Sequence, residues 1–159
     1  LFLQNSQRTV KALNLESAGV EGMELSARRT WPSGLALSAS YTLQDAKNTG
    51  PSPIYNGKRL PYEPRHALFL RSKWQSRRWS LWHEIHYQSE TYRDRANLEE
   101  NMSPESLLQS AGASVELLDG LGLSVEIQNL TDERVTDVEG YPLPGRTYYV
   151  TLTFGGAAQ

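Results

Sequence analysis

The sequence predicts an all-β fold, an antiparallel up-and-down meander of about eight strands. Three observations predict it. Apolar and polar side chains alternate with a period of two, short and long connections alternate between these segments, and tryptophans gather beside the short connections. The mean hydropathy of −0.54 does not exclude a membrane-spanning sheet, because each strand of such a sheet averages an apolar face with a polar one.

Seven segments alternate clearly, and Leu1 to Gln4 is expected to be the stub of an eighth strand. We expect their apolar residues to share one face of a continuous sheet, because each is in phase with its own strand. Arg29 and His83 depart from the pattern as polar residues on the apolar face, and Trp82 departs from it on the polar face. In chain order the expected apolar faces contain Met23, Leu25, Ala27 and Trp31; Leu35, Leu37, Ala39, Tyr41 and Leu43; Leu68, Leu70 and Trp74; Trp79, Leu81, Ile85 and Tyr87; Ala111, Ala113, Val115 and Leu117; Leu121, Leu123, Val125 and Ile127; and Tyr148, Val150, Leu152 and Phe154.

The connections between these segments are alternately short and long. The short ones are Pro32 to Gly34, Gln75 to Arg78, and Asp119-Gly120, which carry turn-forming residues. The long ones run from Ala46 to Pro64, from Glu90 to Ser106, and from Thr131 to Arg146; Ser103-Pro104-Glu105 in the second predicts a short helix start. A meander with tight turns on one side and long loops on the other is typical of transmembrane β-barrels of the outer membrane.

Aromatic residues support the membrane interpretation, because barrels carry Trp and Tyr where the apolar band meets water. The predicted girdle has one ring at the short turns and one towards the long loops. The first ring contains Trp31, Trp74 and Trp79, and the second contains Tyr41, Tyr87 and Tyr148.

Composition excludes several other classes of protein. With 16 Lys+Arg against 18 Asp+Glu the chain lacks the basic surface of a nucleic-acid-binding protein. There is no Cys and there are only three His, so no nucleophile with an adjacent base is visible, and we expect neither enzyme activity nor a cofactor. His83 and His86 do not predict a metal site, because they point to opposite faces of a strand.

Three segments resemble the TonB-dependent outer-membrane receptors. A GvE-containing strand, the periplasmic turn and the next strand of that family are similar to SAGVEGMELSARRTWPSGLALSASYTLQDAK. The strand that follows an "lpy.Pr" loop segment is similar to GKRLPYEPRHALFLRSKW, and the family's ending is similar to VEIQNLTDERVTDVEGYPLPGRTYYVTLTF. The similarity runs from about Glu16 to Phe154, most of the chain.

The resemblance implies that residues 1–154 are the C-terminal part of a receptor barrel with about 22 strands, followed by a tail at 155–159. It implies an active-transport receptor in the outer membrane of a Gram-negative bacterium, with a ferric siderophore, haem, cobalamin or another metal chelate as ligand. The implied partners are outer-membrane lipid, the barrel assembly machinery, and the TonB energy-coupling protein, which acts through a plug domain absent from these residues. The assembly signal would be Tyr148, Val150, Leu152 and Phe154.

The long loops are the expected ligand-binding side, because only they have enough chain to form pockets. Tyr55, Lys58 and Arg59 are the best candidates, since an aromatic ring and two cations suit an anionic chelate. The loop with Tyr92 and the charged residues Glu90, Arg93, Asp94, Arg95, Glu99 and Glu100 is either a ligand contact or a solvated loop.

Two alternatives remain open at this point. A complete eight-stranded outer-membrane barrel with an anchoring or adhesive role would also need about eight strands, because eight strands can close around their own side chains. A soluble lipocalin-like barrel is the other, but its apolar face would point inward and its tryptophans would not need to gather at one rim.

Overall fold

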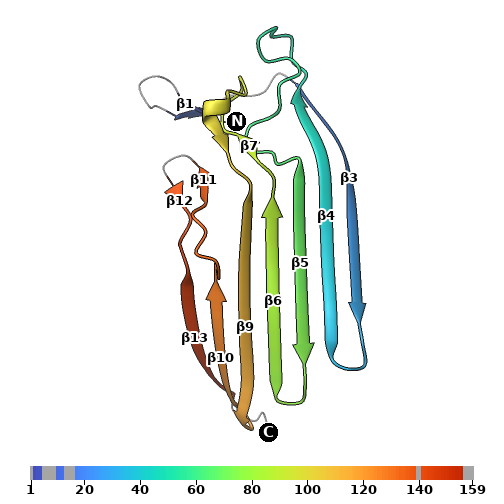
Figure 1. The fold of residues 1–159 in the computed structure, drawn as a ribbon, viewed down its shortest axis with the longest axis vertical. Helices are drawn as coiled ribbons and strands as arrows, with labels where there is room; N and C mark the ends of the chain where they lie inside the picture. The colour runs from blue at the N-terminus through green and yellow to red at the C-terminus, as the bar shows by residue number, and fades with distance from the viewer. Residues whose placement is uncertain (1, 5–9, 13–16, 139–140, 156–159) are drawn as a thin grey trace.

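The computed structural model describes residues 2–4, 10–12, 17–138 and 141–155. Its main feature is one antiparallel seven-stranded sheet with the strand order β13-β10-β9-β6-β5-β4-β3, a meander (Figure 1). The predicted all-β meander is therefore confirmed. The strands of the sheet are β3 (Ala18–Thr30), β4 (Leu35–Asn48), β5 (His66–Gln75), β6 (Trp79–Gln88), β9 (Ser106–Leu118), β10 (Leu121–Gln128) and β13 (Thr147–Phe154).

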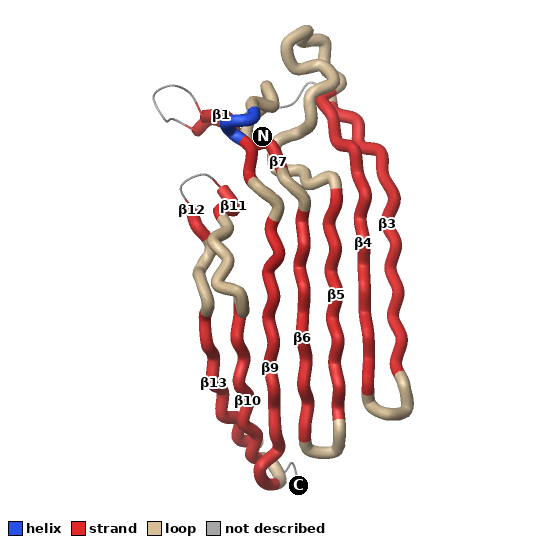
Figure 2. Tube along the Cα trace, in the orientation of Figure 1, coloured by secondary structure: helices blue, strands red, loops and turns tan. Residues whose placement is uncertain are grey.

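All three short turns lie at one end of the sheet, and the three long connections lie at the other, as predicted (Figure 2). The turns are residues 31–34, 76–78 and 119–120, and the long connections are residues 49–65, 89–105 and 129–146. The alternation of short and long links follows directly from the meander, because each successive strand reverses the chain direction.

The strand register confirms that the predicted apolar residues share one face. Residues paired directly across an antiparallel ladder point to the same side. Leu25 pairs with Tyr41 and Trp74 pairs with Leu81, and the same holds across the other half of the sheet, where Val125 pairs with Val150. The register shifts by one residue between Leu121 and Gly122, so Leu117 lies at an irregular end of β9.

The sheet has no core of its own. Among the described residues of the sheet, the small side chain of Ala46 is buried, whereas Val150 and Phe154 are 70% and 75% exposed. The outer strands β3 and β13 are the two edges of the sheet and are not paired with each other. This arrangement is that of an open wall, because it leaves both edges and the apolar face uncovered by the rest of the described chain.

Short strands and one 3-10 helix lie at the long-loop end of the sheet. Two strand pairs and one 3-10 helix lie within the long loops, a third strand pair lies near the start of the chain, and none of these strands joins the large sheet. These elements are β1 (Phe2–Gln4) with β2 (Val10–Ala12), β7 (Thr91–Tyr92) with β8 (Met102–Ser103), β11 (Thr136–Val138) with β12 (Tyr141–Pro142), and the 3-10 helix η1 (Glu99–Asn101).

Two expectations were wrong. Phe2 to Gln4 is not an eighth strand of the sheet, because β1 pairs with β2 in a separate hairpin; Leu1 lies outside the described residues. No helix starts at Ser103, because this residue ends β8 and its hydroxyl accepts a hydrogen bond from Nε of Arg93 at 2.7 Å instead of capping a helix. Of the predicted tail, Gly155 donates its N–H to the carbonyl oxygen of Gly120 at 2.7 Å, and 156–159 lie outside the described residues.

Candidate functional site

The loops 49–65 and 89–105 are joined by the side chain of Asn97. Its Oδ1 accepts a hydrogen bond from the backbone N–H of Arg59 at 2.7 Å, and its Nδ2 donates to the carbonyl oxygen of Arg59 at 3.0 Å. The N–H of Tyr62 donates to the carbonyl oxygen of Tyr92 at 2.9 Å. The two loops therefore form one structural unit, which we call the paired loops.

Two arginine–tyrosine stacks cross between the paired loops. The guanidinium of Arg59 lies 5.7 Å from the ring centroid of Tyr92, and that of Arg95 lies 4.4 Å from the ring centroid of Tyr55. Each stack joins a residue of one loop to a residue of the other, and cation–π attraction holds the cation in place. The ion pair between Arg59 and Glu90, at 3.7 Å, adds a third contact between the loops.

Two guanidinium nitrogens in the paired loops lack a hydrogen-bond partner. Nη2 of Arg59 and Nε of Arg95 are enclosed, and neither has a partner among the residues that the structure describes. Both groups line a small crevice that Asn48, Leu60 and Pro61 complete. Buried donors without a partner are costly, but the crevice leaves no space for a water-sized acceptor, so it is not itself a ligand pocket.

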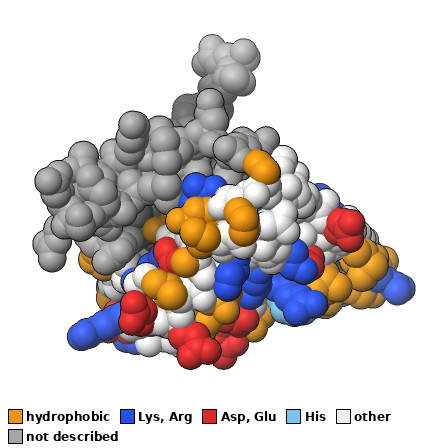
Figure 3. Space-filling view, turned by 90° about the horizontal axis from the view of Figure 1, so that it is seen from above, with side chains coloured by type: hydrophobic (Ala, Val, Ile, Leu, Met, Phe, Trp, Pro, Cys, Tyr) orange, Lys and Arg blue, Asp and Glu red, His pale blue; other side chains and the backbone are white. Residues whose placement is uncertain are grey.

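The predicted ligand-contact residues divide between two environments. Tyr55 and Arg59 are half-buried within the paired loops, whereas Lys58 is exposed. Sequence reasoning favoured a solvated loop over a ligand contact for the segment around Arg95, and it missed Asn97 altogether. The signal for Arg95 was its position close to Tyr92 in a long loop, but nothing in the spacing identified Tyr55 as its partner. From the loop end, Lys and Arg side chains gather at the middle of the described surface with acidic ones beside them (Figure 3).

A groove of about 560 Å³ lies beneath the loops on the polar face of the sheet. Residues of the six strands β4, β5, β6, β9, β10 and β13 and of the connection 129–146 line it, and apolar side chains such as Leu108 and Leu143 are among them. The rings of Phe69 and His86 lie in tilted contact inside this groove, with their centroids 4.8 Å apart and their planes at 54°. The other polar side chains along it are Ser40, Thr42, Gln88, Ser106, Ser110, Gln128, Asn129 and Thr147.

The middle of the polar face contains an ion pair and an aromatic platform. Arg71 on β5 and Glu84 on β6 face each other across the ladder, with Nη1 and Oε1 2.6 Å apart. The Arg71 guanidinium also lies 5.4 Å from the ring centroid of Trp82. The indole of Trp82 covers Gly112 on the next strand, where a Cβ atom would lie 2.6 Å from the ring. Because Gly112 has no side chain, it leaves the space on the polar face that the indole of Trp82 occupies.

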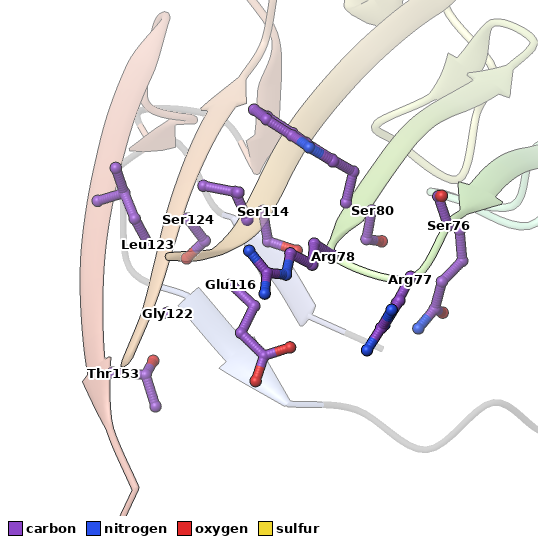
Figure 4. Close-up of a pocket in the computed structure, with 13 residues that line it drawn as sticks. Ser76, Arg77, Arg78, Ser80, Ser114, Glu116, Gly122, Leu123, Ser124 and Thr153 are labelled. Carbon is purple, nitrogen blue, oxygen red and sulfur yellow. The ribbon is translucent and has the colours of Figure 1, made fainter. Parts of the chain in front are cut away.

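A second pocket, of about 330 Å³, lies at the short-turn end (Figure 4). Arg77 and Arg78 of one turn and Glu116 of β9 border it, and most of the remaining polar lining consists of hydroxyl side chains. It lies at the opposite end of the sheet from the paired loops. The residues that supply the hydroxyls are Ser76, Ser80, Ser114, Ser124 and Thr153.

The predicted girdle residues lie at the two ends of the apolar face. Trp31, Trp74 and Trp79 each lie next to a short turn. Towards the loops, the hydroxyl of Tyr41 is 2.7 Å from Nδ1 of His66, and that of Tyr87 donates to Oε2 of Glu105 at 2.9 Å. Tyr148 begins the apolar face of β13, the edge strand that also carries the rest of the predicted assembly signal, Val150, Leu152 and Phe154.

Neither a metal cluster nor a membrane-spanning helix is found in the described part of the chain. No three His, Asp or Glu side chains within it are placed to share a metal ion. His83 and His86 point to opposite faces of β6, as the sequence predicts. No described helix is long and apolar enough to cross a membrane.

Comparison with known proteins identifies the family. The family model described as "TonB dependent receptor-like, beta-barrel" matches residues 2–130. No curated protein matches the sequence.

Solved structures reproduce the fold. The siderophore receptor PiuA from Acinetobacter baumannii is 23% identical with a TM-score of 0.76 over 86% of this chain and 22% of its own. The ferric-catecholate import receptor Fiu from E. coli K12, in its closed form, is 22% identical with a TM-score of 0.73 over 96% of this chain and 23% of its own. The G324V mutant of the ferric enterobactin receptor PfeA from Pseudomonas aeruginosa is 26% identical with a TM-score of 0.69 over 89% of this chain and 23% of its own.

This chain therefore spans less than a quarter of the length of each of these structures. The family model covers most of the sequence, and the sheet superposes on receptor barrels over most of its length. The chain belongs to the family of TonB-dependent receptor β-barrels.

Proposed function

We propose that residues 1–154 are C-terminal barrel strands of an active-transport receptor in the outer membrane of a Gram-negative bacterium, with 155–159 as a tail. The receptor captures a scarce nutrient held in a metal chelate. Of the candidate ligands, we favour a ferric siderophore over haem or cobalamin. Family membership supports this proposal, and so do the three structural neighbours, which are siderophore, ferric-catecholate and ferric enterobactin receptors. All of these are receptors rather than enzymes.

The observation that carries the ligand assignment is the pair of arginine–tyrosine stacks at the loop end. Ferric siderophores expose anionic oxygens and, in many cases, aromatic rings. Guanidinium groups bind such oxygens well, and tyrosine rings offer a flat apolar surface. The paired loops place both kinds of group in one unit, above the groove on the polar face of the sheet through which a released ligand would pass.

The proposed partners follow from the two ends and the two faces of the sheet. Outer-membrane lipid covers the apolar face, and the girdle of Trp31, Trp74, Trp79, Tyr41, Tyr87 and Tyr148 marks its borders. The barrel assembly machinery recognises Tyr148, Val150, Leu152 and Phe154. The TonB energy-coupling protein acts through a plug domain outside these residues.

The alternative of a complete small barrel is disfavoured by the sheet itself. Seven strands form it, and the edges β3 and β13 do not meet among the described residues. A self-contained eight-stranded barrel would pair its first and last strands.

The proposal is tested by replacing Tyr55, Lys58 and Arg59 together with alanine in the full-length receptor. Binding of ferric enterobactin and ferric citrate is measured on isolated outer membranes with radioactive iron. We expect affinity to fall about tenfold or more, because an anionic chelate loses two cations and a ring. The matched control replaces Ser76 and Arg77 at the opposite end of the sheet and leaves affinity unchanged.

Unchanged affinity of the triple variant at normal surface abundance would exclude these residues as ligand contacts. An equal loss in the control would show that the loop end is not the ligand-binding side. Failure of the unsubstituted receptor to bind any ferric chelate would contradict the proposed function as a whole.

A further inference from the structure

Residues 129–133 hold the base of the third long connection together. Oδ1 of Asn129 accepts a hydrogen bond from the N–H of Glu133, and its Nδ2 donates to the carbonyl oxygen of Glu133, both at 2.9 Å. A longer bond of 3.4 Å joins Nδ2 of Asn129 to the carbonyl oxygen of Pro144. Oδ1 of Asp132 accepts the N–H of Arg146 at 2.8 Å. These bonds tie the start of the connection 129–146 to its end, and we call Asn129, Asp132 and Glu133 the loop clasp.

Glu133 also joins the connection to β9 at the point where β10 has ended. β10 ends at Gln128, and beyond it the N–H of Leu130 donates to the carbonyl oxygen of Gln109 at 2.8 Å. The next N–H on that edge of β9 belongs to Leu107, and it donates to both carboxylate oxygens of Glu133, at 3.2 and 3.1 Å. The carboxylate thus takes the place of a strand partner, and hydrogen bonds to a charged acceptor are stronger than those between neutral groups.

The clasped connection lines the groove on the polar face of the sheet. Val135, Leu143 and Pro144 of the connection are part of this lining, and the N–H of Leu143 donates to the carbonyl oxygen of Val135 at 2.9 Å, so the two arms of the connection lie together. Asp132 and Glu133 are not among the described residues that line the groove. They act on it through the residues that they hold in place.

Apolar side chains of the sheet line the same groove, namely Phe69 on β5 and Leu108 on β9. The groove lies at the loop end, since Ser106 and Gln128, at the loop ends of β9 and β10, also belong to its lining. Its volume of about 560 Å³ is within the range of about 300–1,000 Å³ that is typical of small-molecule sites. Apolar side chains beside an aromatic one suit an aromatic ring of a ligand, so the groove favours a chelate that carries such rings.

We propose that Asp132 and Glu133 are positioning residues that give the receptor a preference for chelates with aromatic rings. The inference rests on the proposed function, in which a ferric chelate passes along this groove. Glu133 holds the connection against β9 beside Leu108, and Asp132 holds the arm that carries Leu143 and ends at Arg146. Together they fix the distance between the apolar side chains of the connection and those of the strands, so that an aromatic ring contacts both.

The test compares two ferric chelates on the full-length receptor in isolated outer membranes. Ferric enterobactin carries aromatic rings, and ferric citrate carries none. Glu133→Ala is expected to weaken the affinity for ferric enterobactin about fivefold or more, and that for ferric citrate less than about twofold, because only the first chelate needs the positioned apolar side chains. Glu133→Gln is expected to keep the preference, since its amide oxygen still accepts the N–H of Leu107.

Asp132 offers a second pair of variants. Its φ is 56°, which both glycine and asparagine adopt readily. Asp132→Gly removes the bond to Arg146 and is expected to weaken ferric enterobactin binding about threefold or more, whereas Asp132→Asn keeps the accepting oxygen and the affinity. The matched control is Thr131→Ala. The Thr131 side chain is exposed and makes no hydrogen bond with the described residues, so both affinities are expected to stay unchanged.

Two further measurements separate positioning from a loss of stability. A less stable receptor lowers the number of binding sites for both chelates alike, whereas a displaced connection changes the dissociation constant for one of them. A double-mutant cycle with Leu143→Ala shows whether Glu133 acts through the groove. In that background Glu133→Ala is expected to weaken ferric enterobactin binding less than in the wild type.

Equal weakening for both chelates would overturn the inference, as would additive effects of Glu133→Ala and Leu143→Ala. Equal effects of Glu133→Ala and Glu133→Gln would overturn it as well, because the charge of Glu133 would then be responsible. If Glu133→Ala leaves no binding sites, the two Asp132 variants decide by the same criteria. A receptor that binds ferric citrate as tightly as ferric enterobactin contradicts this inference alone, whereas one that binds no ferric chelate contradicts the proposed function.

Discussion

The guanidinium carbon of Arg95 lies 4.4 Å from the ring centroid of Tyr55, so that a cation of the loop 89–105 covers an aromatic ring of the loop 49–65. Because the Asn97 side chain is hydrogen-bonded to both the N–H and the carbonyl oxygen of Arg59, the conformation of each loop depends on the other. A ligand that touches either loop therefore meets a surface that both determine. Substitutions in one loop are expected to alter the conformation of the other.

Replacing Asn97 with glycine is expected to loosen the paired loops. Glycine tolerates the positive φ of 56° at this position, so the variant removes the two hydrogen bonds to Arg59 and the longer one to the carbonyl oxygen of Asp94 without straining the backbone. Each of the two bonds to Arg59 contributes about 0.5–1.5 kcal/mol, and together they predict proteolytic cleavage within the loops about fivefold faster or more. Limited proteolysis of the folded receptor measures this rate.

The control for that experiment is Asn101→Ala, in the same loop. The Asn101 side chain makes no hydrogen bond within the described part of the chain, so its loss is expected to leave cleavage unchanged. Equal acceleration in both variants would mean that the loop is labile for reasons other than the Asn97 bridge.

Gly112→Ala is expected to destabilise the barrel through Trp82. The added Cβ would lie 2.6 Å from the indole, and the ring must move away from Arg71 to make room. Overpacking of this kind costs about 1–3 kcal/mol. Gly122→Ala is the control on the same face, since the nearest atom to its Cβ would be 3.8 Å away. Denaturant unfolding of the receptor measures both.

A double-mutant cycle separates the contact from a general effect of alanine. In a Trp82→Ala background the indole ring is absent. Gly112→Ala is therefore expected to lower the free energy of unfolding less there than in the wild type. The same cost in both backgrounds would remove Trp82 from the explanation.

The strands could be predicted from the sequence because period-two alternation is a local signal. The segment from Leu35 to Leu43 shows the pattern without interruption. The sheet places its apolar residues on one face, namely Leu35, Leu37, Ala39, Tyr41 and Leu43. Strand ends were less predictable: β4 continues to Asn48 because Asn48 pairs with Ala18 on β3, which is a distant residue. Phe2 to Gln4 alternates too little to show that its partner is β2 rather than the sheet edge.

The site could be predicted only in part, because its contacts join residues that are far apart in sequence. Asn97 and Arg59 are 38 residues apart, and their contact depends on how two irregular loops fold together. Trp82 was noticed as an exception on the polar face, but its explanation lies in a glycine on a neighbouring strand. His83 was likewise an exception, and only the register places Gln109 beside it.

The chain separated from the rest of its receptor is expected to associate in buffer without detergent. Its apolar face leaves large side chains exposed, Leu25 at 56% and Val150 at 70%, and both sheet edges are open. Soluble monomers rarely expose an apolar patch above a few hundred Å². Sedimentation velocity is expected to show species larger than 17.9 kDa. A clean monomer would show that the apolar face is covered by the chain itself.

Gly34→Ala is expected to destabilise the barrel more than Gly57→Ala, although both glycines have a positive φ, 85° and 77°. A positive φ costs alanine about 1–2 kcal/mol of conformational free energy at either position. At Gly34 the Cβ would also overlap the carbonyl oxygen of Gln75, which is fixed in β5, whereas at Gly57 nothing lies within 4 Å. Denaturant unfolding of the full-length receptor should therefore give a clearly lower midpoint for Gly34→Ala. Equal midpoints would mean that φ alone determines the cost and that the turn can move away from β5.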